Sequence, residues 1–484
     1  MQVKVSQSYI GTIGAIVDNY NMFTHINQAL DYIRKYESSA TNKYLYIDEG
    51  TYNEKIEIDI PNLQIVGAGT LTTIIEYNSL YGLVDANGFK HVTDSTMTLA
   101  IREKAINCII ENITISNYYN HIDRFSGVST YNDSNVLTDR TGNGERGLAL
   151  LVQADKFIMK NCRLLGWQDT LETFTGRQYF YNTYICGAVD FIFGTNSTTY
   201  FENCNIEAIK SKTSASSNST AAYVTAYKGL NKSNSDAVEY GAIFDNCNFT
   251  TSSDFIGKVA FIRPWTVYSA VAIINSTISN NYLVKASETI KTGLAYVDGT
   301  TTKVTSWDNI GTLKFKVYNN SSAFTDDISG ITINLTETLA SNYSNFTVIF
   351  GKTNGGVNYS EVWNVDNNIE EPTPTTIVHN FTTAGLTSDF FTISGNLSTS
   401  KGTVSYSGLT LTQCLKMESA TSISFTVTNN CTLKLVFVET APTIKIDGTK
   451  YTETSNIISI ELNSGSHTIT KADTANLFYI ELSY

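Results

Sequence analysis

The stretch that decides the fold is GWQDTLETFTGRQYFYNTYICGAVDFIFG, residues 166–194. It places two aspartates, Asp169 and Asp190, in an otherwise aromatic and apolar run. A carboxylate is costly to bury unless it is paired, hydrogen-bonded or used in chemistry. Two aspartates so close together in this setting therefore need a structural explanation.

The flanking sequence repeats a short pattern of apolar residues, an asparagine, a small or polar residue and another apolar position. It is seen in IMKNCRLLG, YFYNTYICG and YFENCNIEA, whose asparagines are evenly spaced. The six asparagines of the pattern are Asn112, Asn161, Asn182, Asn203, Asn246 and Asn275. A period near 21 with strand-like segments is typical of a β-solenoid. We therefore predict an all-β parallel helix of stacked coils, and an ordinary β-sandwich with chance asparagines is the alternative.

The repeat predicts where the two aspartates lie relative to each other. Asp169 follows Asn161 by eight residues and Asp190 follows Asn182 by eight, so they occupy the same position in consecutive coils. Neighbouring strands are ~4.8 Å apart, so the carboxylates should stack roughly 5 Å from each other. Like charges this close cannot both ionise freely, and we expect one pKa to rise while the other stays low.

One amphipathic helix is expected at residues 24–37. THINQALDYIRKY carries Ile26, Ala29, Leu30 and Ile33 at helical spacing. We expect this helix to cap one end of the solenoid and cover its exposed edge.

Composition excludes several classes of protein. The net charge of −12 argues against a nucleic-acid partner, and no apolar run approaches the ~20 residues that span a bilayer. Seven cysteines without a CxxC pair weaken both a zinc site and a dense disulfide framework, although Cys414 and Cys431 could form a bridge. We expect a secreted protein, because the chain is rich in Asn, Ser, Thr and Tyr and poor in Lys and Glu, with the signal peptide removed or trimmed; a cytosolic protein is the alternative. We also expect a monomer.

Three ordered motifs, GWQDTL, GAVDFIFG and FIRPW, resemble those of the pectin methylesterases, or pectinesterases. The resemblance covers about residues 3 to 365 and includes GTYNEKIEI, FKVYNN and LTETLASNYSNFTVIFG. It implies a right-handed parallel β-helix that hydrolyses the C6 methyl esters of homogalacturonan to methanol and polygalacturonate. It implies neither a metal nor another cofactor.

The resemblance also implies roles for individual residues. Asp190 would be the nucleophile, and Asp169 the general acid and then the base that activates water. Gln168 would donate to the oxyanion, and Arg263 would hold Asp190 ionised. Trp265, Phe193 and Trp167 would contact the sugar rings.

Two positions depart from the family pattern. RGLAL places Arg146 where the family's QAVAL has a second oxyanion glutamine. Arg146 could still donate hydrogen bonds, but it brings a charge beside the catalytic carboxylates. Glu172 replaces the tyrosine of QDTLY, and its charge should disfavour de-esterified units near it.

The C-terminal part has a different pattern. Residues 366–377 contain two of the chain's five prolines and are predicted to be a linker. Residues 378–484 carry alternating short strands that predict a separate β-sandwich. They resemble pectin-binding carbohydrate modules, in which lysines bind the carboxylates of homogalacturonan. The matching residues are Lys401, Lys416 and Lys471, and three solvated surface lysines are the alternative.

Other functions remain open at this point. A polygalacturonase or lyase on the same fold would also use close carboxylates, but Gln168 and Arg263 suit ester chemistry better. A pectin-binding protein whose esterase site has decayed through Arg146 is a second alternative. A relative acting on another ester, such as an acyl thioester, is a third.

Overall fold

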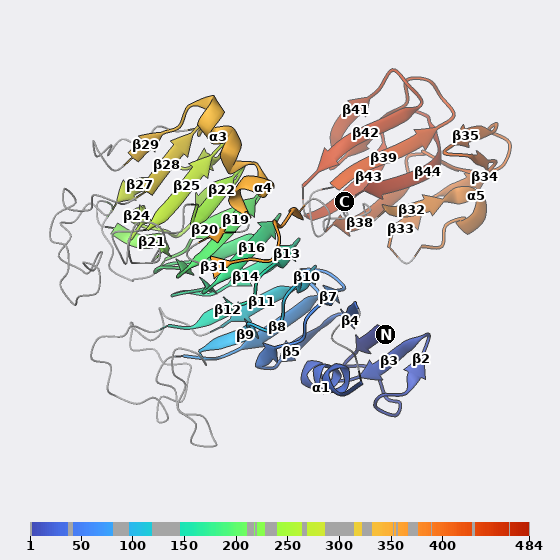
Figure 1. The fold of residues 1–484 in the computed structure, drawn as a ribbon. Helices are drawn as coiled ribbons and strands as arrows, with labels where there is room; N and C mark the ends of the chain where they lie inside the picture. Colours follow the sequence, from blue (N-terminus) through green and yellow to red (C-terminus); the bar gives the residue numbers. More distant parts are fainter. Residues whose placement is uncertain are drawn as a thin grey trace, which may run out of the picture. The chain divides into compact units, whose positions relative to one another are not determined.

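A computed structural model describes most of the 484-residue chain. The described residues are 2–36, 42–80, 96–118, 146–210, 217, 220–227, 240–263, 269–285, 314–321, 332–351, 353–354, 357–365, 376–388, 390–427, 431–463 and 465–483. The chain divides into two compact units, Met1–Val365 and Asp366–Tyr484 (Figure 1).

The first unit is a parallel β-helix with three sheets. The largest sheet has the order β2 (Ile16–Val17), β3 (Tyr20–Phe23), β1 (Gln2–Val5), β4 (Lys43–Ile47), β7 (Leu63–Gly67), β10 (Ile109–Glu111), β13 (Phe157–Lys160), β16 (Gly176–Tyr181), β19 (Ser197–Glu202), β22 (Ala242–Asp245), β25 (Ala270–Ile274), β28 (Lys314–Tyr318) and β29 (Thr332–Asn334). The second has the order β26 (Thr277–Ile278), β23 (Asn248–Thr251), β20 (Asn205–Ala208), β17 (Tyr184–Gly187), β14 (Arg163–Leu165), β11 (Thr114–Asn117), β8 (Thr73–Tyr77) and β5 (Gly50–Asn53). The third has the order β27 (Tyr282–Lys285), β24 (Lys258–Ile262), β21 (Thr220–Tyr227), β18 (Ile192–Gly194), β15 (Leu171–Thr173), β12 (Leu148–Val152), β9 (Met97–Ile101) and β6 (Ile56–Ile58).

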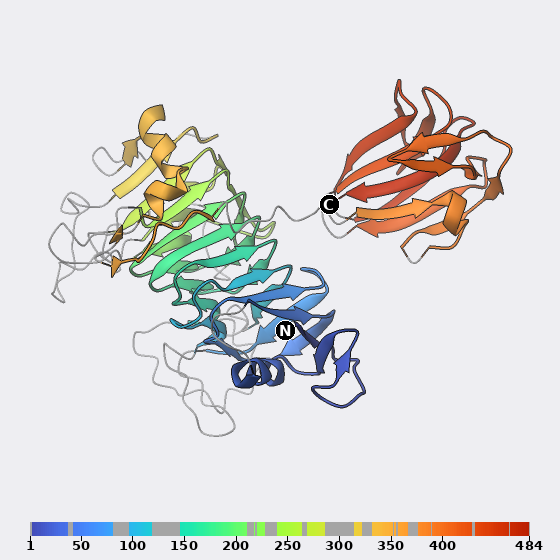
Figure 2. The same cartoon turned by 45° about the vertical axis from the view of Figure 1, so that its right-hand side comes forward.

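In the central coils, paired residues of neighbouring strands are separated by the period that the sequence predicted. In the largest sheet Phe180 pairs with Phe201, and in the third sheet Leu171 pairs with Ile192. Figure 2 shows the strands of the first unit stacked side by side in this way. Like residues therefore stack inside the coil. The ring centroids of Phe180 and Phe201 lie 5.0 Å apart, and those of Phe201 and Phe244 lie 4.6 Å apart.

The repeated asparagines form the corner between the first and second sheets. Asn161, Asn182 and Asn203 have φ angles of 52°, 44° and 54°, which is the left-handed region that asparagine tolerates better than most residues. Their amides also bond between coils: Asn182 donates to Asn161 at 2.8 Å and Asn246 donates to Asn203 at 2.6 Å. The asparagines thus turn the chain at each coil and link successive coils.

The left-handed corner gives a direct test at Asn182. Asn182→Ala should lower the free energy of unfolding by about 1–2 kcal/mol relative to Asn182→Gly, because a residue with a Cβ is strained in this conformation and glycine is not. Both variants lose the amide bond to Asn161, so that contribution cancels. All four tryptophans lie in the first unit, so urea unfolding followed by tryptophan fluorescence measures the difference. Equal stabilities of the two variants would contradict a left-handed backbone conformation at residue 182.

The predicted N-terminal helix is present as α1 (Ile26–Tyr36), at the end of the coil near the N-terminus. Its buried residues are Ile26, Ala29, Leu30 and Ile33, the four that the sequence pattern selected. The carboxylate of Glu54 accepts hydrogen bonds from the backbone N–H groups of Ile26 at 2.8 Å and Asn27 at 3.0 Å. These bonds satisfy donors that the first helical turn leaves free.

The end of the first unit folds back onto the coils. Its elements are α3 (Glu337–Tyr343), α4 (Phe346–Ile349), β30 (Thr353–Asn354) and β31 (Val357–Asn358). Phe346 of α4 packs its ring edge-to-face on Tyr179 at 5.4 Å and Tyr200 at 5.2 Å, which are stacked on the largest sheet.

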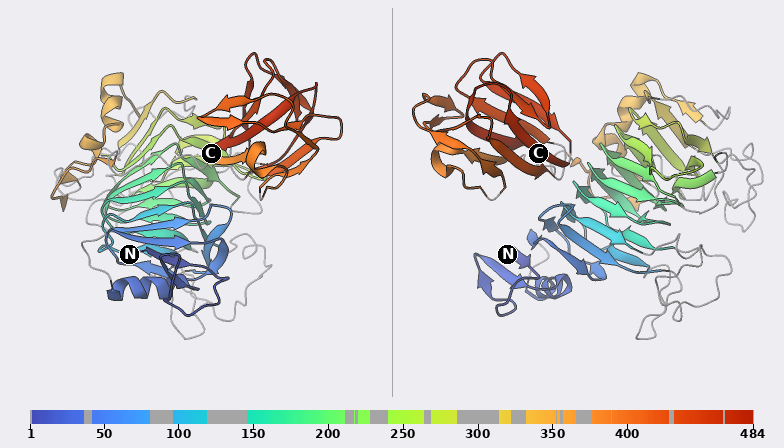
Figure 3. Two further views of the ribbon diagram at one scale, coloured as in Figure 1. Left: turned by 90° about the vertical axis from the view of Figure 1, so that its right-hand side faces the viewer. Right: turned by 180° about the vertical axis from the view of Figure 1, so that it is seen from behind.

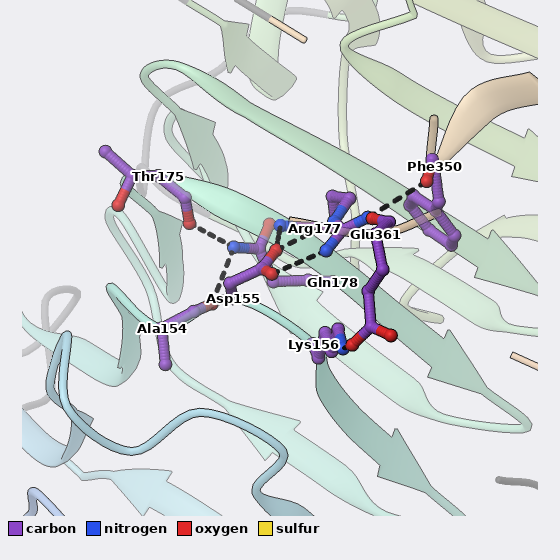
Figure 4. Close-up of polar contacts among 8 residues, drawn as sticks. All are labelled: Ala154, Asp155, Lys156, Thr175, Arg177, Gln178, Phe350 and Glu361. Carbon is purple, nitrogen blue, oxygen red and sulfur yellow. Dashed lines mark hydrogen bonds and ion pairs between the residues drawn. The ribbon is translucent and has the colours of Figure 1, made fainter. Parts of the chain in front are cut away.

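A buried arginine joins this closing segment to the coil (Figure 4). The Arg177 side chain is 1% exposed and binds the carboxylate of Asp155 through Nε at 2.9 Å and Nη2 at 2.7 Å. Its Nη1 donates to the backbone oxygens of Phe350 at 3.0 Å and Glu361 at 2.9 Å. Tyr359 lies against the guanidinium, with its ring centroid 4.0 Å from Cζ. One buried cation therefore satisfies acceptors from three separate parts of the chain.

Replacing Arg177 should be among the most destabilising single changes in the first unit. Arg177→Met leaves the Asp155 carboxylate and two carbonyl oxygens without their donor, and breaking a buried ion pair costs about 3–5 kcal/mol. The matched control is Arg163→Met, because Arg163 is half-buried and lies over Tyr184 at 5.1 Å. Urea unfolding should show a loss several times larger for Arg177→Met; equal losses would contradict the role of the cation.

The second unit has two main antiparallel sheets that form a β-sandwich, seen from two sides in Figure 3. One has the order β34 (Asn396–Ser398), β37 (Cys414–Lys416), β44 (Asn476–Ser483), β39 (Cys431–Phe437) and β42 (Ile457–Leu462), with β32 (Thr376–Asn380) also paired to β44. The other has the order β33 (Thr392–Ser394), β38 (Ser422–Val427), β43 (Gly465–Lys471), β40 (Thr443–Ile446) and β41 (Thr449–Thr452). A hairpin of β35 (Val404–Tyr406) and β36 (Leu409–Leu411) and the short helix α5 (Phe381–Ala384) complete the unit.

The cysteines of the chain are all buried free thiols, so the possible bridge between Cys414 and Cys431 is not formed. Within the described residues no helix is long and apolar enough to cross a bilayer. No cluster of metal-ligating side chains occurs in the part of the chain that the structure describes.

Candidate active site

The two aspartates that posed the problem lie at the edge of the third sheet, each two residues before a strand, β15 for Asp169 and β18 for Asp190. Gln168 and Val189 form a parallel bridge between them, and the N–H of Asp169 donates to the oxygen of Val189 at 3.0 Å. Asp169 and Asp190 both take left-handed φ angles, 56° and 51°. They are therefore equivalent residues of neighbouring coils, as the repeat predicted.

Each aspartate is buried and paired with its own arginine. The side chain of Asp169 is 4% exposed and accepts from Nε of Arg146 at 2.5 Å. The side chain of Asp190 is 3% exposed and accepts from Nη1 of Arg263 at 2.5 Å. The arginine side chains are about one-fifth exposed, at 21% and 20%, so the ion pairs reach the surface of the unit on the arginine side.

The second oxygen of Asp190 is unusual. Its Oδ1 is buried and has no hydrogen-bond partner among the described residues, whereas Oδ2 is held by Arg263. An unpaired polar atom in a protein interior is rare and costly, and such atoms mark strain or function. The carboxylate of Asp190 is thus anchored through one oxygen only.

Burial decides the pKa of both carboxyls. It raises the pKa of Asp190 to about 7 against the opposing charge of Arg263, and the nearby Asp169 carboxylate adds to the rise. Burial also raises the pKa of Asp169, although Arg146 and Arg263 act in the opposite direction. Burial therefore acts on both carboxyls in the same direction, whereas the repeat alone predicted a rise for only one of them.

Arg146 reaches the carboxylates from the coil that precedes them. The N–H of Gly147 donates to the backbone oxygen of Gln168 at 3.2 Å, which places the two predicted oxyanion residues on adjacent coils. A Cβ at Gly147 would lie 2.9 Å from the oxygen of Ser79 and 3.1 Å from Nδ2 of Asn117. Only glycine lets the chain pass this closely.

The residues expected to contact substrate lie in different environments. Trp167 and Gln168 are half-buried beside Asp169. Phe193 is 3% exposed, and its ring centroid lies 5.7 Å from Cζ of Arg146. Glu172 is 4% exposed and pairs with Phe193 in the ladder between β15 and β18. Trp265 lies outside the described residues.

Sequence reasoning missed Tyr223. In the coil that follows Asp190, Tyr223 occupies the position equivalent to Asp190, because Ile192 pairs with Thr225. Its N–H donates to the oxygen of Ala188 at 2.8 Å. Its ring centroid lies 5.2 Å from Cζ of Arg263, so it helps to hold that arginine. The repeat could not reveal Tyr223, because an insertion in this coil makes its distance from Asp190 in the sequence longer than one period.

The three lysines that the sequence selected in the second unit lie on different elements: Lys416 ends β37, Lys471 ends β43 and Lys401 precedes β35. Lys416 forms an ion pair with Glu418 at 2.8 Å. Lys416 and, more weakly, Lys471 lower the pKa of the Glu418 carboxyl, and both Lys401 and Lys416 act on the Cys414 thiol beside them. Lys416 thus shares one neighbouring group with Lys471 and another with Lys401.

Comparison with known proteins identifies the class of the first unit. Residues 14–290, more than half of the chain, match the family model for pectinesterase, and the chain belongs to this family. Probable pectinesterase A of Neosartorya fischeri is 32% identical over 267 residues, which cover 54% of this chain and 70% of that protein. Probable pectinesterase 29 of Arabidopsis thaliana is 30% identical over 264 residues, which cover 53% of this chain and 66% of that protein.

A solved structure shares the fold of the first unit. Pectin methylesterase PemA from Erwinia chrysanthemi aligns with a TM-score of 0.56 at 21% identity, over 73% of this chain and 98% of that chain. In the second unit, residues 375–480 match the family model for carbohydrate binding module 77. The chain therefore joins a pectinesterase β-helix to a carbohydrate-binding β-sandwich.

Proposed function

We propose that the protein is a pectin methylesterase that hydrolyses the C6 methyl esters of homogalacturonan. The observation that carries the proposal is the buried, unpartnered Oδ1 of Asp190 beside the stacked carboxyl of Asp169. Family membership supplies the reaction class, and this geometry supplies a nucleophile and an acid at one place.

In the first half of the reaction, Oδ1 of Asp190 attacks the ester carbonyl carbon. Gln168 and Arg146 donate to the oxyanion of the tetrahedral intermediate, which lowers its free energy. Asp169 gives its proton to the departing methoxide, so methanol leaves and an anhydride joins Asp190 to the galacturonate.

In the second half, Asp169 takes a proton from a water molecule. The hydroxide attacks the galacturonyl carbonyl of the anhydride, and Asp190 leaves as a carboxylate. Arg263, bonded to Oδ2, keeps Asp190 oriented and stabilises its charge at both stages. The galacturonic acid that forms loses its proton to solvent, so the products are methanol, a galacturonate carboxylate, one proton and the starting enzyme.

Replacing the nucleophile tests this function. Asp190→Asn keeps the shape of the side chain but removes its nucleophilic oxygen, so methanol release from esterified pectin should fall by at least about a thousandfold, as for lost members of catalytic triads. Asp59→Asn is the control, because Asp59 forms only a surface ion pair with Arg34 at 2.8 Å. New reducing ends without methanol would instead indicate a polygalacturonase. Pectin retention with no methanol from the wild type would indicate a decayed, pectin-binding site.

We also propose the division of labour along the chain. Residues 1–365 form the esterase domain, residues 366–377 link it to the rest, and residues 378–484 form a pectin-binding module. Trp167 and Trp265 provide the apolar contacts of the esterase site, and the buried Phe193, also expected to contact substrate, packs against Arg146. A module that holds the polymer raises its effective concentration at the esterase site. Because pectin is a cell-wall polymer, this function requires a secreted protein.

In the module, Lys401, Lys416 and Lys471 bind the carboxylates that demethylation creates. Their shared action on Glu418 and Cys414 supports this, since a polyanion needs several cations within a few sugar units. Glu418 holds Lys416 in place until a substrate carboxylate competes for it.

Affinity gels test the lysine cluster. Lys416→Ala/Lys471→Ala in the full chain should reduce retardation by low-ester pectin by at least about tenfold in Kd, and wild-type retardation should weaken with added salt. Lys450→Ala is the matched control, because that lysine is 60% exposed and lies 3.7 Å from Asp473 instead. Unchanged retardation of the double variant would leave the three lysines as ordinary surface residues.

A further inference from the structure

Arg146 does more at this site than a neutral hydrogen-bond donor can. Its Nε lies 2.5 Å from Oδ2 of Asp169, and this ion pair is largely buried. A guanidinium carries its charge at every working pH, so it favours the ionised form of the carboxyl it touches. The residue expected only to stabilise an oxyanion is therefore bonded directly to the general acid of the proposed mechanism.

Glu172 is a further negative group that acts on Arg146. It pairs with Phe193 across the ladder of β15 and β18, and the guanidinium of Arg146 lies 5.7 Å from the Phe193 ring. The carboxylate of Glu172 acts electrostatically on Arg146, as do those of Asp169 and Asp190. At 4% exposure Glu172 has little surface with which to contact a sugar directly.

Among the described residues, Arg146 and Arg263 act on Asp169, and the carboxylates of Glu172 and Asp190 act on Arg146. Arg146 precedes β12, Glu172 lies in β15, Asp190 precedes β18 and Arg263 follows β24. Of these, Arg146 touches Asp169 and Arg263 touches Asp190. Of the two arginines, Arg146 is the one bonded to Asp169, and Glu172 acts electrostatically on that arginine.

We propose that Arg146 and Glu172 act as an opposed pair of positioning residues that set the pH range in which Asp169 carries its proton. This inference rests on the proposed function, in which Asp169 must be protonated to release methanol. Arg146 favours loss of that proton, and Glu172 favours its retention. The esterase would then work best at a lower pH than the same site with a neutral residue at position 146.

The two substitutions should move the basic limb of the pH profile of kcat/KM in opposite directions. Arg146→Gln keeps a donor but removes the cation, so ionised Asp169 loses stabilisation, its pKa rises and the limb moves up by roughly 1–2 pH units. Glu172→Gln removes a nearby negative charge, so the pKa falls and the limb moves down. The acidic limb should move less, because Asp190 is bonded to Arg263 rather than to Arg146.

The control removes an arginine from the same sheet without touching the site. Arg102 follows β9 and pairs with Glu57 at 2.9 Å, so Arg102→Gln makes the same change in net charge. The basic limb of the pH profile of kcat/KM for Arg102→Gln should coincide with that of the wild type. Shifts of the same sign for Arg146→Gln and Glu172→Gln, or no shift in either, would overturn the proposal even if methanol is released normally.

A second readout does not depend on turnover. Infrared titration of the carboxyl C=O band, taken as the difference between each protein and its Asp169→Asn counterpart, reports the protonation of Asp169 itself. The midpoint should rise in Arg146→Gln and fall in Glu172→Gln, and an unmoved midpoint would refute the inference. A wild type that releases no methanol but shows these midpoint shifts would refute the proposed function and leave the pair intact.

Discussion

In-register stacking of parallel coils is the constraint on which the rest of the first unit depends. Because the coils in the centre of the solenoid repeat with one fixed period, Leu171 pairs with Ile192 and the residues before them pair as well. Asp169 and Asp190 are adjacent for this reason alone. A change of one residue in the period would turn one of the two carboxyls to the other face of its strand.

The fold buries both carboxyls, and burial disfavours their ionised form. Both are almost fully buried, and burial is the largest influence on both pKa values. Two arginines from the preceding and following coils compensate, one for each carboxyl. The balance between burial and these two cations, more than the repulsion between the carboxyls, sets the charge of the site.

The same logic of buried charge appears away from the site. Arg177 is as buried as any apolar residue of the core, yet it joins Asp155 to the closing segment at Phe350 and Glu361. A solenoid has open ends and weak lateral ties between distant coils, since each coil contacts mainly its neighbours. The helix α1 at the start and this cation towards the end supply the tertiary contacts that the repeat does not.

The sequence by itself determined the coil, the capping helix and the stacking of Asp169 on Asp190, because a fixed period of apolar residues and asparagines dictates register. It also indicated Arg263 and the three lysines through their motifs. Only the tertiary structure decided which arginine each carboxyl binds, that both carboxyls are raised in pKa, and that Tyr223 follows Asp190 in the ladder. These depend on residues brought together across insertions and on the depth of burial, and neither quantity is written in a local pattern.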